Sequence, residues 1–236
     1  MSSQALTLRH GDQERRANFA VIDGTVLPEP ESFLNQTELA AFSALRFPLK
    51  RQGFLLGRLA AKRALGALLA EPDLRSIDIR SGVFGQPLVR HPGAGGIEVT
   101  LSHSHGLAVA LAYPGEMPMG VDLETVSAVA AGTLLAELQL SAAEKAWLAA
   151  GKVDEASACG VLWTAREALA KSMKIGLNCP LGVLSLDHIE SAGAAAWDCR
   201  YANFPQSRCL AQAIDARVLS IAIPAETELS PWPRLR

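Results

Sequence analysis

The sequence PGEMPMGVDLE, residues 114–124, marks the clearest division of the chain. Proline and glycine interrupt both helices and strands, so residues 114–118 form the strongest breaker near its middle. On each side of this breaker, helical sequence is followed by strand-like runs. Helices are expected over 53–69 before it and over 129–137 and 157–173 after it. The repeated order predicts an α+β fold of two similar halves, residues 1–116 and 117–236.

The sequence also predicts where the strands and helix caps of this fold lie. Strands are expected over 77–79, 99–102, 107–113, 120–124, 183–186, 195–201, 209–214 and 218–223, with a hairpin over 82–88. Within residues 33–39, Asn35 and Thr37 are plausible caps before a short helix. Ser141 and Glu144 have the spacing of a capping box, which predicts another helix start there.

The composition limits the classes of protein to which the chain can belong. With 236 residues, 49% hydrophobic and 19% charged, the chain can build a sizeable core. A net charge of -2 does not provide the basic surface expected of a nucleic-acid-binding protein. An anionic ligand would therefore need a local cluster of basic residues. Residues 1–18 lack the apolar core of a signal peptide, and no apolar run is long enough to span a membrane. The four cysteines lack metal-finger spacing, so we expect thiols in the cytoplasm.

Two acids lie close together directly after the breaker. Asp122 and Glu124 are two residues apart on an expected strand, so their side chains share one face. Adjacent carboxylates repel each other unless a cation neutralises them, and hard oxygen ligands suit Mg²⁺. Taken alone, the two acids are more commonly part of a solvated edge strand.

A second acid-bearing motif lies on the expected helix over 157–173. Trp163, Glu167 and Lys171 are spaced four apart, which places an aromatic ring, an acid and an ammonium along one stripe. Taken alone, Glu167 and Lys171 are more commonly a helix salt bridge.

Candidate phosphate-binding side chains lie in the first half. Ser102 and His103 end an expected strand, where neighbours point to opposite faces and cannot share a proton directly, so phosphate binding by His103 is favoured over a nucleophilic serine. Arg58 and Lys62 are four apart on one helix face, and alone they favour a solvated face.

In this order, these motifs resemble those of the 4′-phosphopantetheinyl transferases of the larger, surfactin-synthetase-activating type. The family's G-x-D-x-E motif is matched by GVDLE at 120–124, and its W-x-x-K-E-x-x-x-K motif by WTAREALAK at 163–171. Its G-K-P and S-H-S segments resemble residues 85–87 and 102–104. Two departures stand out, because Gln86 and Arg166 each replace a lysine of the family pattern, and arginine and lysine are not interchangeable.

The resemblance implies two pseudo-symmetric α+β halves with coenzyme A between them. It implies a Mg²⁺-dependent transfer (Mn²⁺ is possible) of 4′-phosphopantetheine from coenzyme A to a carrier-protein serine, releasing 3′,5′-ADP. Asp122, Glu124 and Glu167 would bind the metal. Glu167, Lys171 and Asp122 would be catalytic, with Glu167 as the proposed base and Lys171 at the leaving phosphate. The coenzyme A contacts implied are Arg58, Lys62, Gln86, Pro87, Ser102, His103 and Lys171.

The resemblance also implies a partner, an apo acyl or peptidyl carrier protein. Such partners are small, acidic and helical, so an apolar patch with a basic rim is expected, with residues 126–140 as the candidate segment. A monomer without nucleic acid or membrane contacts is expected. Two rivals remain, namely another Mg²⁺-dependent phosphohydrolase and a non-catalytic module that binds carrier proteins.

Overall fold

The computed structural model describes residues 2–125 and 127–235, apart from the side chains of residues 128–130. It forms two compact units, Met1–Pro118 together with Thr227–Arg236, and Met119–Glu226. The sequence placed the junction two residues earlier and kept the C-terminal residues with the second half. They join the first unit because their strand pairs with the N-terminal strand. Of the helices described, none is both long and apolar enough to cross a membrane.

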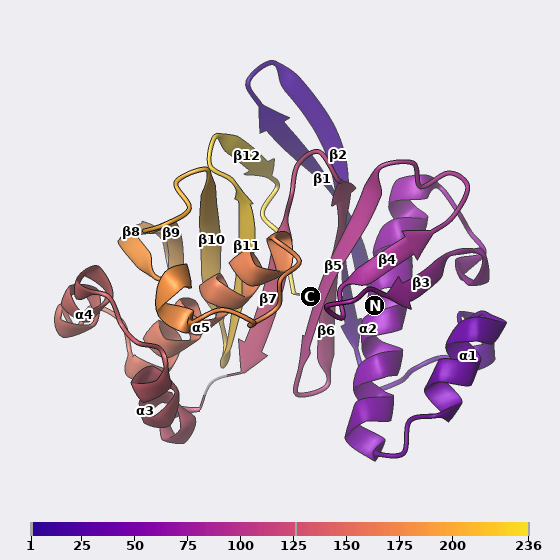
Figure 1. Cartoon of the computed structure of the whole chain (residues 1–236), viewed down its shortest axis with the longest axis horizontal. Coiled ribbons are helices and arrows are strands. Elements are labelled where there is room, and N and C mark those ends of the chain that lie inside the picture. The colour runs from indigo at the N-terminus through magenta and orange to yellow at the C-terminus, as the bar shows by residue number, and fades with distance from the viewer. Residues whose placement is uncertain (1, 126, 236) are drawn as a thin grey trace. The chain divides into compact units, whose positions relative to one another are not determined.

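The first unit is built on a five-stranded antiparallel sheet (Figure 1). Its order is β12 (Thr227–Ser230), β1 (Ser2–His10), β2 (Gln13–Asp23), β6 (Leu107–Pro114) and β5 (Ile97–Ser104). The long helix α2 (Pro48–Leu69) packs its Leu and Ala side chains against this sheet, and Asn35 caps the short helix α1 (Gln36–Ser43) as expected. A separate hairpin pairs β3 (Asp78–Ser81) with β4 (Pro87–Arg90). The sequence did not reveal β1, β2 or β12.

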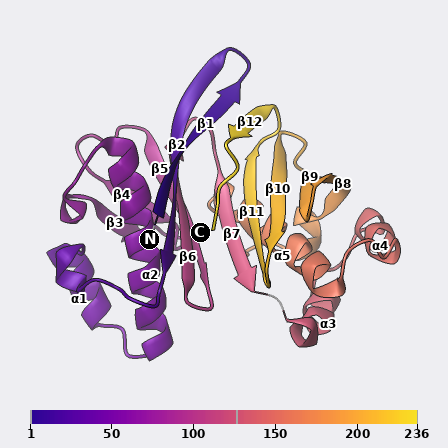
Figure 2. The ribbon, with the colours of Figure 1, turned by 180° about the vertical axis from the view of Figure 1, so that it is seen from behind.

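The second unit has its own five-stranded antiparallel sheet. The order is β7 (Gly120–Thr125), β11 (Arg217–Pro224), β10 (Ser207–Ile214), β9 (Ala196–Tyr201) and β8 (Leu186–Gly193). The helices are α3 (Ala128–Glu137), α4 (Ala142–Ala149) and α5 (Glu155–Ser172), and Figures 1 and 2 show α5 against one face of the sheet. The strand expected over 183–186 was wrong. Residues Leu181–Leu184 form a 3-10 turn, because Pro180 begins a turn that its carbonyl closes with the Val183 N–H.

Each unit contains the same buried ion pair, and the first pair joins α1 to α2. Asn35 and Glu38 form a capping box, and the Glu38 carboxylate also accepts a hydrogen bond from the Ile79 N–H at 3.2 Å. Its other partner is Lys62 of α2, whose Nζ lies 2.6 Å away with no side-chain surface exposed. The ammonium also donates to the carbonyls of Leu74 and Ile77. All of its donors therefore point into the protein.

The second pair joins α4 to α5 in the same way. Ser141 and Glu144 form the expected capping box, and the Glu144 carboxylate accepts from the Leu186 N–H at 2.9 Å. Its ionic partner is Arg166 of α5, whose Nη2 lies 2.8 Å away, and both side chains are fully buried. A capping acid, a strand N–H and a buried cation of the long helix thus recur in both units. Together with the corresponding strand orders β2-β6-β5 and β7-β11-β10, this confirms two pseudo-symmetric α+β halves.

Candidate active site

The acidic strand β7 lies at one edge of the second sheet, paired with β11. Asp122 is nevertheless buried, with 1% of its surface exposed, and Glu124 is half-buried. These are not the surface acids that a solvated edge strand would carry. Ionised carboxylates are rarely buried unless they are paired or bind a cation.

Gly120 lets β7 approach α5 closely. A Cβ at this position would lie 1.9 Å from the Ala168 carbonyl oxygen and 2.7 Å from the Ser172 nitrogen. Both atoms belong to the backbone of α5 and cannot rotate away. The glycine that opens GVDLE therefore sets the distance between the acidic strand and the helix, a role that the sequence alone did not reveal.

Helix α5 presents the expected stripe. Trp163, Glu167 and Lys171 are each half-buried, while every position between them is buried. Trp163 packs on the core of the unit. The Lys171 Nζ lies 2.6 Å from an Asp122 oxygen and 3.9 Å from a Glu167 oxygen. The lysine therefore connects the helix to the strand, and its contact with Glu167 is the weaker of the two.

The local charges act on Glu167 most strongly. The pKa of Glu167 is raised from its ordinary 4.5 to about 7, chiefly by burial and also by the charges of Asp122 and Glu124, against the opposing effect of Lys171. The charges of Asp122, Glu124 and Lys171 therefore all act on Glu167. A carboxyl group with a pKa of about 7 can both accept and release a proton near neutrality.

The donor set of this site suits a hard divalent cation. Among residues 2–125 and 127–235, no three His, Cys, Asp or Glu side chains are already gathered closely enough to hold a metal ion. The chemistry of the set nevertheless fits, because Asp122, Glu124 and Glu167 offer only oxygen donors and carry excess negative charge. A bound cation would relieve the repulsion that raises the pKa of Glu167.

The structure gives Lys62 a different role from the expected phosphate contact. Its ammonium is fully buried and bound by Glu38 and two carbonyls, so it cannot reach a ligand from solvent. Arg58, one turn away, keeps 12% of its side chain exposed, 3.8 Å from Glu38 and over the Phe54 ring. Burial lowers the pKa of Arg58, and the charge of Glu38 opposes that effect. Helix spacing showed that the two cations share a face, but that face points to a buried acid.

His103 and Ser102 occupy opposite faces of β5, as the strand period predicted. Ser102 is buried and His103 is exposed. The imidazole lies over α2, because a Cβ at Gly53 would come within 2.9 Å of its Nε2. At Gly57, one turn on, a Cβ would lie 3.2 Å from Leu101 and at an ordinary contact distance of 3.7 Å from the ring. Gly53 is therefore the glycine that makes room for His103 on the helix.

Gln86 and Pro87 lie at the turn between β3 and β4. The Gln86 side-chain oxygen accepts a hydrogen bond from the Phe84 N–H at 2.9 Å, and Pro87 begins β4. Both residues are half-buried, beside the exposed side chains of Val83 and Phe84. In place of the family's lysine, the glutamine thus stabilises the turn.

Comparison with known proteins identifies the family. Residues 118–221, which lie almost wholly in the second unit, match the model of the 4′-phosphopantetheinyl transferase superfamily. Holo-[acyl-carrier-protein] synthases from three strains of Streptococcus agalactiae are each 35% identical to the chain over 85 residues. That region is 34% of this chain and 71% of each relative. The chain belongs to the 4′-phosphopantetheinyl transferase superfamily. Its matched part carries all four charged residues of the candidate site.

Two solved structures are similar to part of this transferase-family chain. A holo-(acyl-carrier-protein) synthase of Bacillus anthracis in complex with CoA (3′,5′-ADP) is 19% identical, with a TM-score of 0.37, and covers 46% of this chain and 93% of its own. A holo-[acyl-carrier-protein] synthase of Thermotoga maritima is 22% identical, with a TM-score of 0.33, and covers 51% and 69%. Membership of the superfamily therefore rests on the sequence match.

Proposed function

We propose that this protein transfers 4′-phosphopantetheine from coenzyme A to a serine of an acyl or peptidyl carrier protein and releases 3′,5′-ADP. The observation that carries the proposal is the charged group formed by β7 and α5. Asp122 and Lys171 are 2.6 Å apart, and Glu167 is held at a pKa of about 7 beside them. This group lies in the part of the chain that matches the superfamily.

The carrier serine loses its hydroxyl proton in the reaction, and we assign the role of proton acceptor to Glu167. The carrier serine oxygen forms a bond to the β-phosphorus of coenzyme A, and the anhydride bond from that phosphorus to the α-phosphate oxygen breaks. The serine hydroxyl proton passes to the Glu167 carboxylate, the acid of this group whose pKa is raised in the metal-free protein. Lys171 places an ammonium beside Asp122, where it can bind the negative charge that leaves with 3′,5′-ADP.

Asp122, Glu124 and Glu167 would hold Mg²⁺, with Mn²⁺ as the alternative. Such a cation supplies charge neutralisation for the pyrophosphate when it is bound. The three side chains are suited to it by their oxygen donors and by their negative charges, which act with burial to raise the pKa of Glu167. Asp122 would serve both the cation and Lys171.

We further propose that the protein is of the larger, surfactin-synthetase-activating type. The support is the presence of two units in which the strand orders β2-β6-β5 and β7-β11-β10 correspond, and in which a buried cation of the long helix binds a capping acid. The first unit would bind coenzyme A through Arg58, Gln86, Pro87, Ser102 and His103. Lys62 is left out of this set because Glu38 already binds its ammonium.

The carrier protein would meet the segment 126–140, which includes α3. Residue 126 lies outside the described residues. The proposal of this docking surface rests on the resemblance to the family. We propose that the enzyme acts as a cytoplasmic monomer, since two fused units already provide both halves.

The decisive experiment incubates the purified protein with coenzyme A, Mg²⁺ and an apo carrier protein and then weighs the carrier. A mass gain of one phosphopantetheine, absent with Glu167→Gln and retained with Glu155→Gln, supports the proposal. Glu155 is an exposed acid in the first turn of the same helix, so it controls for loss of a carboxylate from α5. Phosphate release without a carrier would instead indicate a phosphohydrolase, and carrier binding without a mass gain would indicate a binding module.

A further inference from the structure

The Lys171 ammonium contacts two of the carboxylates proposed to bind the divalent cation. Its Nζ lies 2.6 Å from Asp122 Oδ1 and 3.9 Å from a Glu167 oxygen. The first distance is at the short end for a charge-assisted hydrogen bond to a carboxylate, and the second is too long for a hydrogen bond. Asp122 is therefore the acid that the lysine holds.

The two partners of this ion pair differ in their freedom to move. The Asp122 side chain is only 2% exposed, and its strand is held close to α5, because a Cβ at Gly120 would lie 1.9 Å from the Ala168 carbonyl oxygen. The Lys171 side chain is 27% exposed, and its ammonium is carried by a flexible four-carbon stem. If the pair opens, the lysine is therefore the partner that moves.

A divalent cation at Asp122 would compete with the ammonium for the same carboxylate. Mg²⁺ binds carboxylate oxygens at about 2.1 Å, so on Oδ1 it would lie within about 5 Å of the Lys171 nitrogen. Two positive charges this close repel each other far more in a buried site than in water. The lysine and the cation therefore cannot both bind Asp122 Oδ1 without a large cost in free energy.

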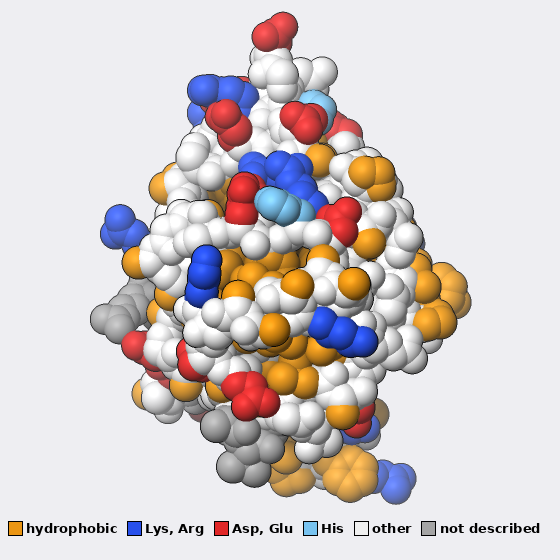
Figure 3. Space-filling model, turned by 90° about the vertical axis from the view of Figure 1, so that its left-hand side faces the viewer, with side chains coloured by type: hydrophobic (Ala, Val, Ile, Leu, Met, Phe, Trp, Pro, Cys, Tyr) orange, Lys and Arg blue, Asp and Glu red, His pale blue; other side chains and the backbone are white. Residues whose placement is uncertain are grey.

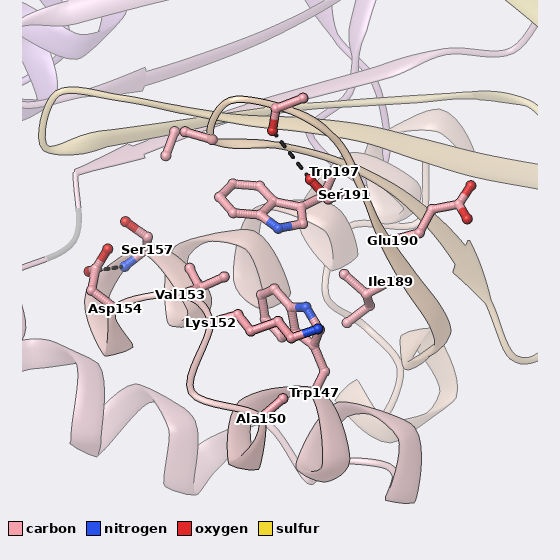
Figure 4. A pocket seen from close by; sticks show the side chains of 13 residues that line it. Trp147, Ala150, Lys152, Val153, Asp154, Ser157, Ile189, Glu190, Ser191 and Trp197 are labelled. Carbon is pink, nitrogen blue, oxygen red and sulfur yellow. Dashed lines mark hydrogen bonds between the residues drawn. The ribbon is translucent and has the colours of Figure 1, made fainter.

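Lys152 shows how a lysine near acids is arranged elsewhere in the same unit. It is exposed and lines the cavity beside α4, β8 and β9 together with Asp154 and Glu190 (Figure 4). The Asp154 carboxylate caps the start of α5, and Glu190 contacts His188 at 3.2 Å, so each acid has another partner. Figure 3 likewise shows Asp and Glu side chains of one face dispersed among Lys and Arg. Lys171 differs because the acid it holds is buried.

We propose that Lys171 is a built-in counter-ion of Asp122 and has to leave this carboxylate before a divalent cation binds there. Once released, its exposed stem lets the ammonium extend from α5 toward solvent, where it can contact the phosphates of coenzyme A. Lys171 thus serves Asp122 first and the leaving phosphate afterwards. The inference rests on the proposed function, because it assumes the cation site of Asp122, Glu124 and Glu167, and it adds the order of events at that site.

Calorimetric titration with Mg²⁺ alone, without coenzyme A or carrier, tests the displacement. Lys171→Ala removes the competing ammonium and should tighten Mg²⁺ binding by about five- to twenty-fold, as expected for one charge-assisted hydrogen bond of a partly exposed pair. Lys171→Met repeats the test with a longer side chain if the alanine variant does not fold. Lys152→Ala is the matched control and should stay within about twofold of the unsubstituted protein, because exposed charges are screened.

The possible failures of this titration are distinct. Equal or weaker Mg²⁺ binding by Lys171→Ala would overturn the displacement and leave the proposed function standing. Lack of Mg²⁺ binding by every protein would overturn the cation site itself, and the displacement with it.

A small ammonium ion separates displacement from a general effect of net charge. Ethylammonium can refill the space that Lys171→Ala vacates, so at constant ionic strength it should weaken Mg²⁺ binding saturably, back toward the affinity of the unsubstituted protein. Tetramethylammonium carries the same charge but no N–H donor and should not. The unsubstituted protein should respond to neither ion. Equal effects of both ions on Lys171→Ala, or no effect of ethylammonium, would contradict the displacement.

Discussion

Replacing Glu167 with glutamine should stabilise the metal-free protein at alkaline pH. The Glu167 side chain is only 22% exposed, and its folded pKa of about 7 exceeds its ordinary value of 4.5. At about 1.4 kcal/mol per pKa unit, this difference corresponds to about 3 kcal/mol of unfolding free energy. The folded state holds the proton longer than the unfolded state does. The contribution of Glu167 to stability is therefore fully present below pH 4.5 and is lost as the pH rises through about 7.

Glutamine stays neutral, so the variant does not lose this stability. Urea unfolding with a metal chelator present should show Glu167→Gln gaining about 3 kcal/mol over the parent between about pH 4.5 and about pH 8. Glu155→Gln is the control for loss of an acid from α5. A gain of less than about 1 kcal/mol over this range would refute the account of a buried Glu167 repelled by Asp122 and Glu124.

Added Mg²⁺ extends the same measurement. A cation bound by the three carboxylates should raise the unfolding free energy of the unsubstituted protein at alkaline pH. The increase should be RT ln(1 + [Mg²⁺]/Kd), which is about 2.7 kcal/mol at a hundredfold excess over Kd. Glu167→Gln removes one carboxylate ligand, so Mg²⁺ should raise the unfolding free energy of this variant by less. Equal rises in both proteins would exclude Glu167 as a ligand of the cation.

Substitutions at four other positions test the rest of the account. Asp122→Asn should abolish transfer to the carrier, measured by mass, while the circular dichroism spectrum stays unchanged; full activity would remove the metal-site interpretation. Gly120→Ala should lower the free energy of unfolding by about 1–3 kcal/mol, measured in urea, because its Cβ meets the backbone of α5 at 1.9 Å. Arg166→Met should cost about 3–5 kcal/mol by leaving the buried charge of Glu144 unpaired, and Arg166→Lys should cost clearly less. Gln86→Lys should tighten coenzyme A binding in calorimetry if the charge is a missing contact; unchanged or weaker binding would mean that another group serves there.

Much of the second unit could be predicted because its signals are local. The capping box of Ser141 and Glu144 and the stripe of Trp163, Glu167 and Lys171 depend on spacings of three or four residues, and both are present. Such patterns need only the geometry of one helix. They place side chains on a face but do not say what that face meets.

The parts that could not be predicted depend on partners distant in sequence. Lys62 looked like a surface cation beside Arg58, but its burial is decided by Glu38, 24 residues earlier. The strand β12 pairs with β1 from the opposite end of the chain, and short β-strand sequence does not identify such a partner. The charged residues at the ends of β1 and β2 also obscured their apolar middles.

The repeated ion pair explains why arginine at position 166 is compatible with an active site. Arg166 points away from the acids of β7 and binds Glu144, as Lys62 binds Glu38 in the first unit. This arrangement thus accepts either lysine or arginine, because the cation only has to hold the long helix, α2 or α5, to a capping acid. The residue after this cation is Glu167 in the second unit and the exposed Arg63 in the first. At that position the second unit therefore has an acid that belongs to the proposed site with Asp122 and Lys171, whereas the first unit has a basic residue on the same framework.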